Sequence, residues 1–426
     1  MTPAARLAAA IELLGGIESD RRPADAVANE FFRNRRFIGG ADRRDVSVMV
    51  WAVLRERMRL GWWLTHYGAE QTPRLIIAVA SLLRGNSLGK VEALFANGRY
   101  AAGALSEAEK TLLERMAGHT LEHPNMPEHV KLEIPDFVLP LLRAKFGNGL
   151  EAELAAMSTQ APLDLRVNLL KGSRADAIAA LRREGVAAVP TPFSPWGLRI
   201  EARQSVTAGA AFREGLIEIQ DEGSQLVAMV VDAQPGQRVA DYCAGAAGKT
   251  LAIAMTMENK GHIFACDVST PRLDAAIKRL RRAGVHNAER HLLEPGDKWA
   301  KRQAGSFDRV LIDAPCTGTG TWRRNPDGRL RLRPIDLAEI APKQAMILDT
   351  AQKLLRIGGR LVYATCSILD EENEAQMSGF LQRHPGFRRV DIAGSLPAAL
   401  HGPALSLTPL RHNTDGFFAA CLERVA

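Results

Sequence analysis

Four short apolar runs in the second half of the chain alternate with helical segments, and this alternation limits the possible folds more than any other feature of the sequence. The runs are QRVADYC at 237–243, GHIFACD at 261–267, FDRVLIDA at 307–314 and GRLVYATC at 359–366. Between the second and third runs, apolar residues recur at helical spacing and stop at Gly284, and a further helix is predicted over 342–357. Strands that alternate closely with helices are typical of a parallel sheet covered by helices on both faces. We therefore predict a doubly wound α/β sheet within residues 219–426.

The first 218 residues lack this alternation. Residues 1–130 are predicted to be helical, because apolar residues at 46, 49, 50, 53 and 54 form one helix face. Residues 131–218 mix helical segments with strand-like runs such as 163–170, which indicates a small α+β module. Five arginines near the first apolar face either hold RNA phosphates or form a solvated surface: Arg33, Arg35, Arg36, Arg43 and Arg44.

The charge and the cysteines narrow the class of protein. Lysine and arginine number 55 against 48 aspartates and glutamates, and the net charge of +7 favours a polyanionic partner. We find neither a signal peptide pattern nor an apolar run long enough for a bilayer, so we expect a cytoplasmic protein with no membrane partner. The five cysteines are odd in number and widely spread, which fits neither a disulfide framework nor a CxxC metal site. We expect free thiols and no bound metal at Cys243, Cys266, Cys316, Cys366 and Cys421.

The loop CAGAAGKT at 243–250 follows the first strand and opens a helix. Its small residues would let backbone approach a ligand at a helix N-terminus, although such residues can also serve only tight packing. Asp267 ends the next strand, where a carboxylate can bind both hydroxyls of a ribose. The spacing GxxxxGK[ST] of a phosphate-binding loop is absent. The pattern therefore favours an adenosine ligand without a pyrophosphate, such as S-adenosylmethionine.

Five stretches together resemble a known family: DYCAGAAGKT, DAPCTGTGTWRRNPD, ATCSILDEENE, QDEGSQLVA and TDGFFAACLER. They are similar to the RNA cytosine carbon-5 methyltransferases of the Fmu/Sun (RsmB) family, with the greatest likeness to the bacterial enzymes that act on 16S ribosomal RNA. The resemblance implies a Rossmann-like methyltransferase domain over 219–426 with S-adenosylmethionine as cofactor. It also implies an all-α RNA-binding domain over 1–130, similar to the antitermination factor NusB, and an RNA-binding α+β module over 131–218.

The family's cofactor site maps onto the loop after the first strand, Asp267, an acid after the third strand, and Asp313. The family's third strand falls between the second and third apolar runs listed above. The best candidate for the acid that follows it is Glu294 in HLLEPGD, with Asp297 as its rival. The family usually has Ala-Pro-Gly-Gly-Lys where this chain has Gly-Ala-Ala-Gly-Lys, so Ala247 replaces a glycine. If residue 247 needs a positive φ, its side chain costs roughly 1 kcal/mol and weakens cofactor binding. The loop residues implied are Cys243, Ala244, Gly245, Ala246, Ala247, Gly248 and Lys249.

The resemblance assigns different steps to two cysteines. Carbon 5 of cytosine is a poor nucleophile, and a thiolate added at carbon 6 makes it reactive toward the methyl group. By resemblance Cys366 is this nucleophile, and Cys316 assists release of the product. Asp313 is expected to hydrogen-bond the flipped base or to hold the cofactor. Arg323 and Arg324 either clamp phosphates or form a surface pair, and the acids at 370–374 are expected to begin a helix.

Two other functions fit the same residues. The motifs do not name the RNA, so the enzyme could methylate transfer RNA instead of 16S ribosomal RNA. The protein could also be a non-catalytic ribosome-assembly factor that binds RNA while Ala246 and Ala247 spoil the cofactor loop. The presence of both Cys316 and Cys366 argues against that last reading.

Overall fold

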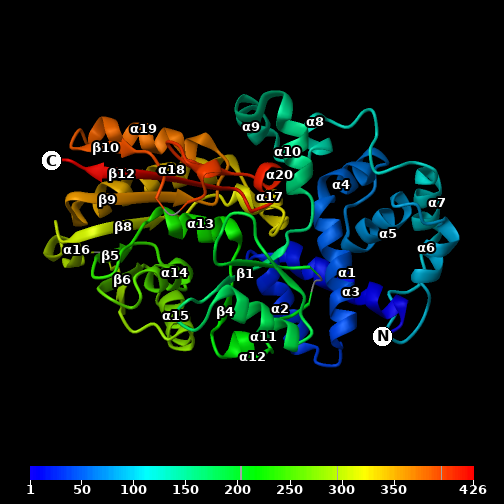
Figure 1. Ribbon diagram of the computed structural model, residues 1–426. Helices are drawn as coiled ribbons and strands as arrows, with labels where there is room; N and C mark the ends of the chain where they lie inside the picture. The colour runs from blue at the N-terminus through cyan, green and yellow to red at the C-terminus, as the bar shows by residue number, and fades with distance from the viewer. Residues whose placement is uncertain (202–203, 295, 395) are drawn as a thin grey trace. The chain divides into compact units, whose positions relative to one another are not determined.

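The computed structural model describes residues 1–201, 204–294, 296–394 and 396–426, and the chain forms two compact units (Figure 1). Unit 1 contains Met1–Thr159 together with Trp322–Arg333, and unit 2 contains Gln160–Thr321 together with Pro334–Ala426. The boundary predicted after residue 130 falls inside unit 1, and the one after residue 218 falls inside unit 2.

Unit 1 is built from helices. The apolar face predicted near residue 50 is confirmed on α3, where Val46, Val50, Val53 and Leu54 are buried and Met49 packs against the same core. Ser106 begins α7 with a capping box, in which its hydroxyl and the Glu109 carboxylate satisfy each other's backbone N–H groups. The helices of this unit are α1 (Pro3–Ser19), α2 (Ala24–Asn34), α3 (Gly40–Arg55), α4 (Arg57–His66), α5 (Pro73–Leu83), α6 (Leu88–Leu94), α7 (Glu107–Met116), α8 (Glu128–Lys131), α9 (Leu139–Phe146), α10 (Leu150–Met157) and α17 (Asp327–Arg331).

The segment Trp322–Arg333 lies in unit 1 although its neighbours in sequence lie in unit 2. An oxygen of Asp327 accepts from the first N–H of α2, at Ala24, over 3.0 Å. The guanidinium of Arg329 is buried and donates to the carbonyl groups of Glu133 and Met157. Arg323 is only 1% exposed, so the interpretation of Arg323 and Arg324 as a surface pair is wrong for Arg323.

Unit 2 contains a small sheet with the strand order β2-β3-β1-β4, in which all the neighbours are antiparallel. The strand-like run at 163–170 is confirmed as β1, which ends at Val167. Leu165 and Val167 pack with Ala177 and Leu181 of α11. The elements are β1 (Leu163–Val167), α11 (Arg174–Arg183), β2 (Ala188–Pro190), β3 (Gly197–Ile200), α12 (Ala210–Arg213) and β4 (Ile217–Ile219).

The larger sheet of unit 2 has the order β10-β12-β9-β8-β5-β6-β7, with β11 paired to β12. The strands from β9 to β7 are parallel, whereas β12 runs antiparallel to β9 and β10 antiparallel to β12. The predicted doubly wound sheet is confirmed. The strands are β5 (Arg238–Asp241), β6 (His262–Asp267), β7 (Ala288–Leu292), β8 (Phe307–Asp313), β9 (Leu355–Thr365), β10 (Phe387–Val390), β11 (Leu405–Leu407) and β12 (Phe417–Arg424).

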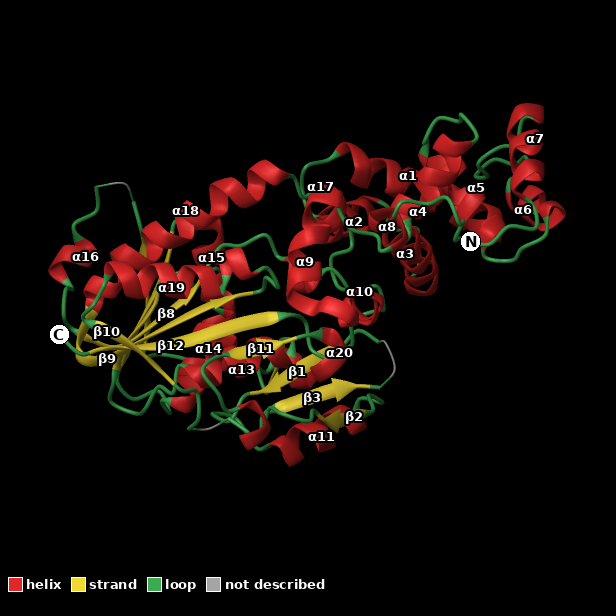
Figure 2. Cartoon of the chain, turned by 90° about the horizontal axis from the view of Figure 1, so that it is seen from above, coloured by secondary structure: helices red, strands yellow, loops and turns green. Residues whose placement is uncertain are grey.

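Helices cover both faces of this sheet (Figure 2). Residues of α13 and α14, such as Leu226 and Ile253, pack on one face, and residues of α18 and α19, such as Leu348 and Phe380, pack on the other. Because the chain order reverses between the neighbouring strands β5 and β8, a crevice is expected at their carboxyl ends. The helices are α13 (Glu222–Val230), α14 (Gly248–Thr256), α15 (Thr270–Ala283), α16 (Trp299–Arg302), α18 (Pro334–Ala351), α19 (Glu374–Arg383) and α20 (Pro409–His412).

The helix predicted over 342–357 is wrong at both ends. It begins eight residues earlier, at Pro334, and it contains Pro342 in its interior. It ends at Ala351, because β9 begins at Leu355 and pairs there with Phe307 of β8. Leu354 therefore belongs to the 3-10 turn η4 (Gln352–Leu354), and Leu355 and Ile357 belong to the start of a strand rather than to a helix face.

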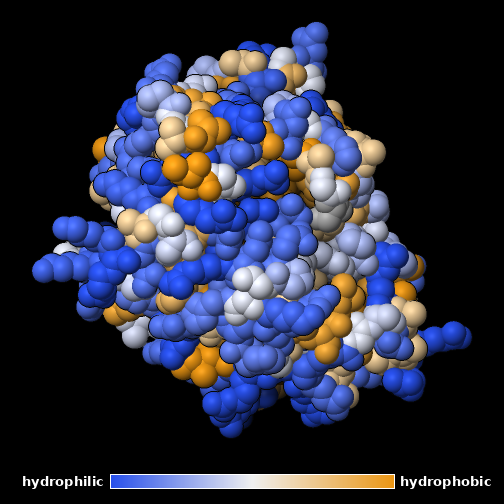
Figure 3. Space-filling model, turned by 60° about the vertical axis from the view of Figure 1, so that its left-hand side comes forward, coloured by the Kyte–Doolittle hydropathy of each residue, from blue (hydrophilic) through white to orange (hydrophobic). Residues whose placement is uncertain are grey.

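The surface side chains are mixed in character. Hydrophilic residues cover most of the face drawn in Figure 3, and apolar residues appear there in small, separate groups. Within the described residues, no helix is both long and apolar enough to span a membrane.

Candidate active site

The carboxyl ends of neighbouring strands bring three predicted residues, Asp267, Asp313 and Cys366, to one edge of the large sheet, together with Asp241, which the sequence reasoning did not assign to the site. Asp241 ends β5, Asp267 ends β6 and Asp313 ends β8, while Cys366 directly follows β9. Cys316 lies three residues beyond the end of β8. Parallel strands end at the same edge, so the fold gathers these side chains at the edge where such sheets bind their ligands.

The loop between β5 and α14 makes hydrogen bonds with residues of three other elements, β6, α15 and β1. Asp267 accepts from the backbone N–H of Gly245 and of Ser269, each over 2.8 Å. Arg279 of α15 donates to the carbonyl of Ala246 over 2.7 Å. Arg166 of β1, which is 2% exposed, donates to the carbonyl of Gly248 over 2.8 Å. Arg166 was missed by the sequence reasoning, although a charged residue inside an apolar strand is the signal that marks it.

Ala247 has φ 63° and ψ 29°, the left-handed conformation in which the family's usual glycine is favoured. Ala247 is the N-cap residue of α14, and it is fully buried. Its neighbours in the core include Leu251 and Ala276. The methyl group of Ala247 therefore strains the left-handed backbone, while the burial of this methyl group stabilises the folded state.

Ala247→Gly is expected to change the free energy of unfolding by no more than about 1 kcal/mol. Relief of the left-handed strain gains about 1 kcal/mol, but loss of a buried methyl costs about 0.8 kcal/mol. The strain belongs to the folded loop itself and is present with and without cofactor. Contrary to the expectation from the sequence, the dissociation constant for S-adenosylmethionine should therefore change by less than about threefold. Urea unfolding and calorimetric titration test this, and a tightening beyond about tenfold would show that Ala247 opposes cofactor binding.

Asp241 is a fully buried carboxylate beneath this loop. Its Oδ2 accepts from the hydroxyl of Thr250 over 2.7 Å, and its Oδ1 has no hydrogen-bond partner among the described residues. Burial, together with the charges of Asp313 and Asp267, raises the pKa of Asp241 to about 7. S-adenosylmethionine carries an ammonium and a sulfonium group, and an unpartnered carboxylate oxygen among three acids fits such a cation.

Asp241→Asn is expected to remove part of the pH dependence of stability. The folded-state pKa lies above the unfolded value of about 4, so stability from this group is present below pH 4 and is lost as the pH rises through about 7. The wild type should lose up to about 1.4 kcal/mol per pH unit in that window relative to the variant. Urea unfolding of both proteins from pH 4 to pH 8 measures the difference, and parallel curves would contradict this role for Asp241.

Lys249 and Asp313 form an ion pair at this edge of the sheet, with Nζ and Oδ2 2.6 Å apart. The Lys249 side chain is largely buried, and the Asp313 side chain is 32% exposed. Burial alone would lower the pKa of Lys249, but the charge and hydrogen bond of Asp313 outweigh it and raise that pKa above its usual value. Lys249 therefore remains a cation, and its hydrogen bond engages only one of the two oxygens of Asp313.

The two cysteines assigned by resemblance lie together. The Sγ atoms of Cys316 and Cys366 are 3.3 Å apart, within reach of an S–H···S hydrogen bond, and both residues are half-buried. The hydrogen bond with Cys366, burial and the charge of Glu372 raise the pKa of Cys316 well above its usual value. All five cysteines are free thiols, as predicted, and Cys266 and Cys421 are buried in the core.

Glu372 is a second residue that the sequence reasoning missed. The acids at 370–374 do begin a helical segment, as predicted, with η5 (Asp370–Glu372) followed by α19. Glu372, however, is 0% exposed and does not face solvent. Its carboxylate accepts from the backbone of Thr317 over 2.8 Å and from the hydroxyl of Ser367. The sequence signal that could have pointed to Glu372 is the hydroxyl-bearing residue that directly follows each cysteine, Thr317 after Cys316 and Ser367 after Cys366.

The acids proposed for the third strand lie just beyond β7. Glu294 is exposed and two residues past the strand end. Asp297 is engaged with the ring of His291 over 2.6 Å and with the backbone of Trp299 over 2.8 Å. Val268, directly after Asp267, is 72% exposed and was not considered from the sequence. An exposed apolar side chain beside an acid at a strand end suits the face of an adenine ring.

Comparison with known proteins relates the chain to RNA methyltransferases. Residues 228–423 match the family 16S rRNA methyltransferase RsmB/F, and residues 134–207 match the RsmF/B-like ferredoxin-like domain. The Probable ribosomal RNA small subunit methyltransferase B of Synechocystis sp. is 32% identical over 380 residues, which cover 87% of this chain and 83% of the relative.

Two solved structures have a similar fold. The crystal structure of PH0851 superposes with a TM-score of 0.80 at 26% identity and covers 100% of this chain and 99% of its own. A methyltransferase homologue protein from Pyrococcus horikoshii has a TM-score of 0.62 at 29% identity, over 71% of this chain and 100% of its own.

Proposed function

This chain belongs to the 16S rRNA methyltransferase RsmB/F family, and on that premise we propose that it methylates carbon 5 of a cytosine in 16S ribosomal RNA. Its cofactor is S-adenosylmethionine. The observation that supports carbon-5 chemistry most directly is the pair of thiols 3.3 Å apart at the ends of β8 and β9. Addition and elimination at one carbon require a nucleophile and a group that helps it leave, and two adjacent thiols supply both.

Cys366 is assigned as the nucleophile. Its Sγ adds to carbon 6 of the base and thereby makes carbon 5 electron-rich. When bound, S-adenosylmethionine supplies the electrophilic methyl group on its sulfonium. A water molecule then takes the proton from carbon 5, and the electron pair of that C–H bond forms the double bond between carbons 5 and 6. The bond between carbon 6 and Sγ breaks as this happens, and its electron pair returns to Cys366. Cys316 assists this elimination from 3.3 Å away.

Asp313 is assigned to the base, because its carboxylate ends β8 and only one of its oxygens pairs with Lys249. The other oxygen can accept from a donor on the Watson–Crick edge of an extruded cytosine. Lys249 fixes the carboxylate in place. The loop held by Asp267, Arg166 and Arg279 is assigned to the cofactor, with Asp241 for its positive groups and Asp267 for its ribose.

RNA binding is assigned to the helical N-terminal region and to the α+β module. Arg33, Arg36 and Arg44 are exposed and are therefore the arginines proposed to contact phosphates. Arg35 and Arg43 are less suited to this role. Arg35 pairs with Glu12, and Arg43 donates to the carbonyl of Ile38.

The proposal is tested by methylation of purified RNAs with tritiated S-adenosylmethionine, followed by nucleoside analysis. We expect 5-methylcytidine in 16S ribosomal RNA and none in transfer RNA. Label in transfer RNA alone would favour the alternative substrate, and a methyl group at another atom would contradict the carbon-5 mechanism. A scaffold without activity would show neither product nor saturable binding of the cofactor by calorimetry.

A further inference from the structure

The residues directly before and after Ala247 both have carbonyl groups that accept hydrogen bonds from arginines. Arg279 of α15 donates to the carbonyl of Ala246 over 2.7 Å, and Arg166 of β1 donates to the carbonyl of Gly248 over 2.8 Å. Ala247 lies between them in the left-handed conformation, with φ 63°. The residue with the strained backbone is therefore the one whose neighbours are bound from two other elements.

These two hydrogen bonds restrain the backbone of Ala247. Its φ and ψ angles set the direction of the chain before it relative to the chain after it. A change to the right-handed conformation would turn the carbonyl of Ala246 relative to that of Gly248, so that at least one arginine would lose its acceptor. An alanine favours the right-handed conformation by about fivefold in population, but loss of a buried hydrogen bond from a charged donor costs more than this preference gains.

Glu218 of β4 supplies the negative charge for this group of arginines. Its carboxylate lies 3.5 Å from the guanidinium of Arg279 and 2.5 Å from that of Arg282, and the residue is 8% exposed. Burial lowers the pKa of Arg166 to about 10, and the charge of Glu218 opposes this shift. Arg166 therefore remains a cation at neutral pH, and it also donates to the side-chain oxygen of Gln220 over 2.5 Å.

The small sheet that carries these charges is itself fixed against α15. Arg166 and Glu218 are direct partners in the register of β1 with β4, so they lie on the same face of the small sheet. Asn168, directly beyond β1, donates to the carbonyl of Ala283 at the end of α15 over 2.8 Å. The position of the two arginines is therefore set by the packing of the small sheet on this helix, and not by the loop that they bind.

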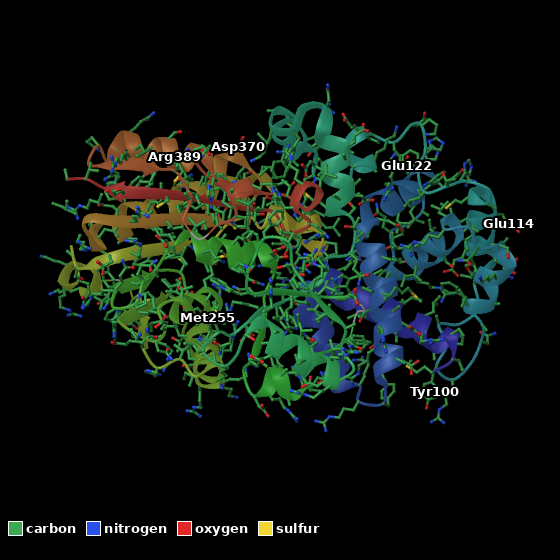
Figure 4. All side chains as sticks on the ribbon, viewed as in Figure 1. Tyr100, Glu114, Glu122, Met255, Asp370 and Arg389 are labelled. Atoms are coloured by element: carbon green, nitrogen blue, oxygen red, sulfur yellow. The ribbon has the colours of Figure 1, made fainter. Side chains whose placement is uncertain are left out.

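We propose that Arg166 and Arg279 are positioning residues that hold Ala247 in its left-handed conformation, and that the small sheet thereby sets the affinity of the loop for S-adenosylmethionine. Helix α14, on which Figure 4 labels Met255, begins at this loop, so the same restraint fixes the first turn of the helix. This inference deepens the proposed function, because it rests on the assignment of the loop at 243–250 to the cofactor.

The test measures the dissociation constant for S-adenosylmethionine by calorimetry with the full-length protein. Arg279→Met should weaken binding by about fivefold, because Ala247 then populates the right-handed conformation and only a fraction of the protein can bind. Arg166→Met should have the same effect. Ala247→Gly added to either variant should return the dissociation constant to within about twofold of the wild-type value, since glycine adopts the left-handed conformation without strain.

The matched control is Arg282→Met, on the same helix. The guanidinium of Arg282 pairs with the same carboxylate, that of Glu218, and lies 3.9 Å from the centre of the Phe212 ring. Its loss should lower stability toward urea but change the dissociation constant by less than about twofold. The proposal would be overturned if Arg282→Met weakened binding as much as Arg279→Met, or if Ala247→Gly failed to restore binding in the Arg279→Met protein.

Hydrogen exchange of the cofactor-free protein is a second test. The N–H of Ala247 donates to the carbonyl of Ala244 over 2.8 Å and closes the turn. Peptides that cover 244–250 should exchange faster in Arg279→Met than in the wild type or in Arg282→Met, and unchanged exchange would overturn the proposal. Neither readout uses RNA. Failure of the wild type to methylate 16S ribosomal RNA, with both readouts as expected, would refute the reaction and leave this role of the arginines standing.

Discussion

Cys316→Ala is expected to trap the protein on its RNA as a covalent complex, whereas Cys366→Ser is expected to lose methyl transfer altogether. Cys366 starts the reaction, and a serine hydroxyl at neutral pH is far too weakly ionised to replace a thiolate. Without Cys316, addition and methyl transfer still proceed, but nothing 3.3 Å from Cys366 helps its sulfur to leave. The adduct therefore accumulates.

Denaturing electrophoresis with labelled RNA separates these outcomes. The Cys316→Ala protein should give a band that survives denaturation, and the wild type should give little because elimination is fast. Replacing both cysteines should abolish the band, since the trapped species depends on Cys366. A trapped complex in Cys366→Ser with none in Cys316→Ala would reverse the two assignments.

Asp313→Asn is expected to lower the rate of methyl transfer by about 10²–10³-fold, the range typical of a lost hydrogen bond to the reacting group. The variant loses the charge that pairs with Lys249 over 2.6 Å and the carboxylate proposed to hold the base. The dissociation constant for S-adenosylmethionine should change by only a fewfold, because Asp241 and Asp267 are assigned to the cofactor. Single-turnover kinetics and calorimetry measure the two quantities separately.

Asp308→Asn is the matched control for this variant. Asp308 lies at the opposite end of β8, where it accepts from the backbone of Arg238 over 2.8 Å and from Arg356 over 2.7 Å. Its replacement removes a carboxylate from the same strand without changing the crevice, so methyl transfer should be nearly unaffected. If Asp313→Asn instead weakens cofactor binding by tenfold or more, Asp313 belongs to the cofactor site and not to the base.

Local sequence patterns were sufficient for the main sheet and for the edge at which the site lies. The four predicted strands correspond to β5, β6, β8 and β9, because buried parallel strands leave long apolar runs. Their ends place Asp241, Asp267, Asp313 and Cys366 at one edge, since parallel strands share a direction. The strand β7 (Ala288–Leu292) was implied only by the resemblance, as the strand before Glu294. It left no apolar run because it is the edge strand of the sheet, and its residues AERHL are half-buried or exposed.

Only the tertiary structure decided how the site residues are paired. The thiols of Cys316 and Cys366 meet across 50 positions of sequence, and Glu372 reaches Thr317 across 55. Arg166 reaches the carbonyl of Gly248 across 82 positions, from a different sheet. Periodicity and spacing report only on neighbours within a few residues of each other, so they placed the residues that end the strands. The contacts that pair these residues exist only once β8, β9 and the small sheet have packed.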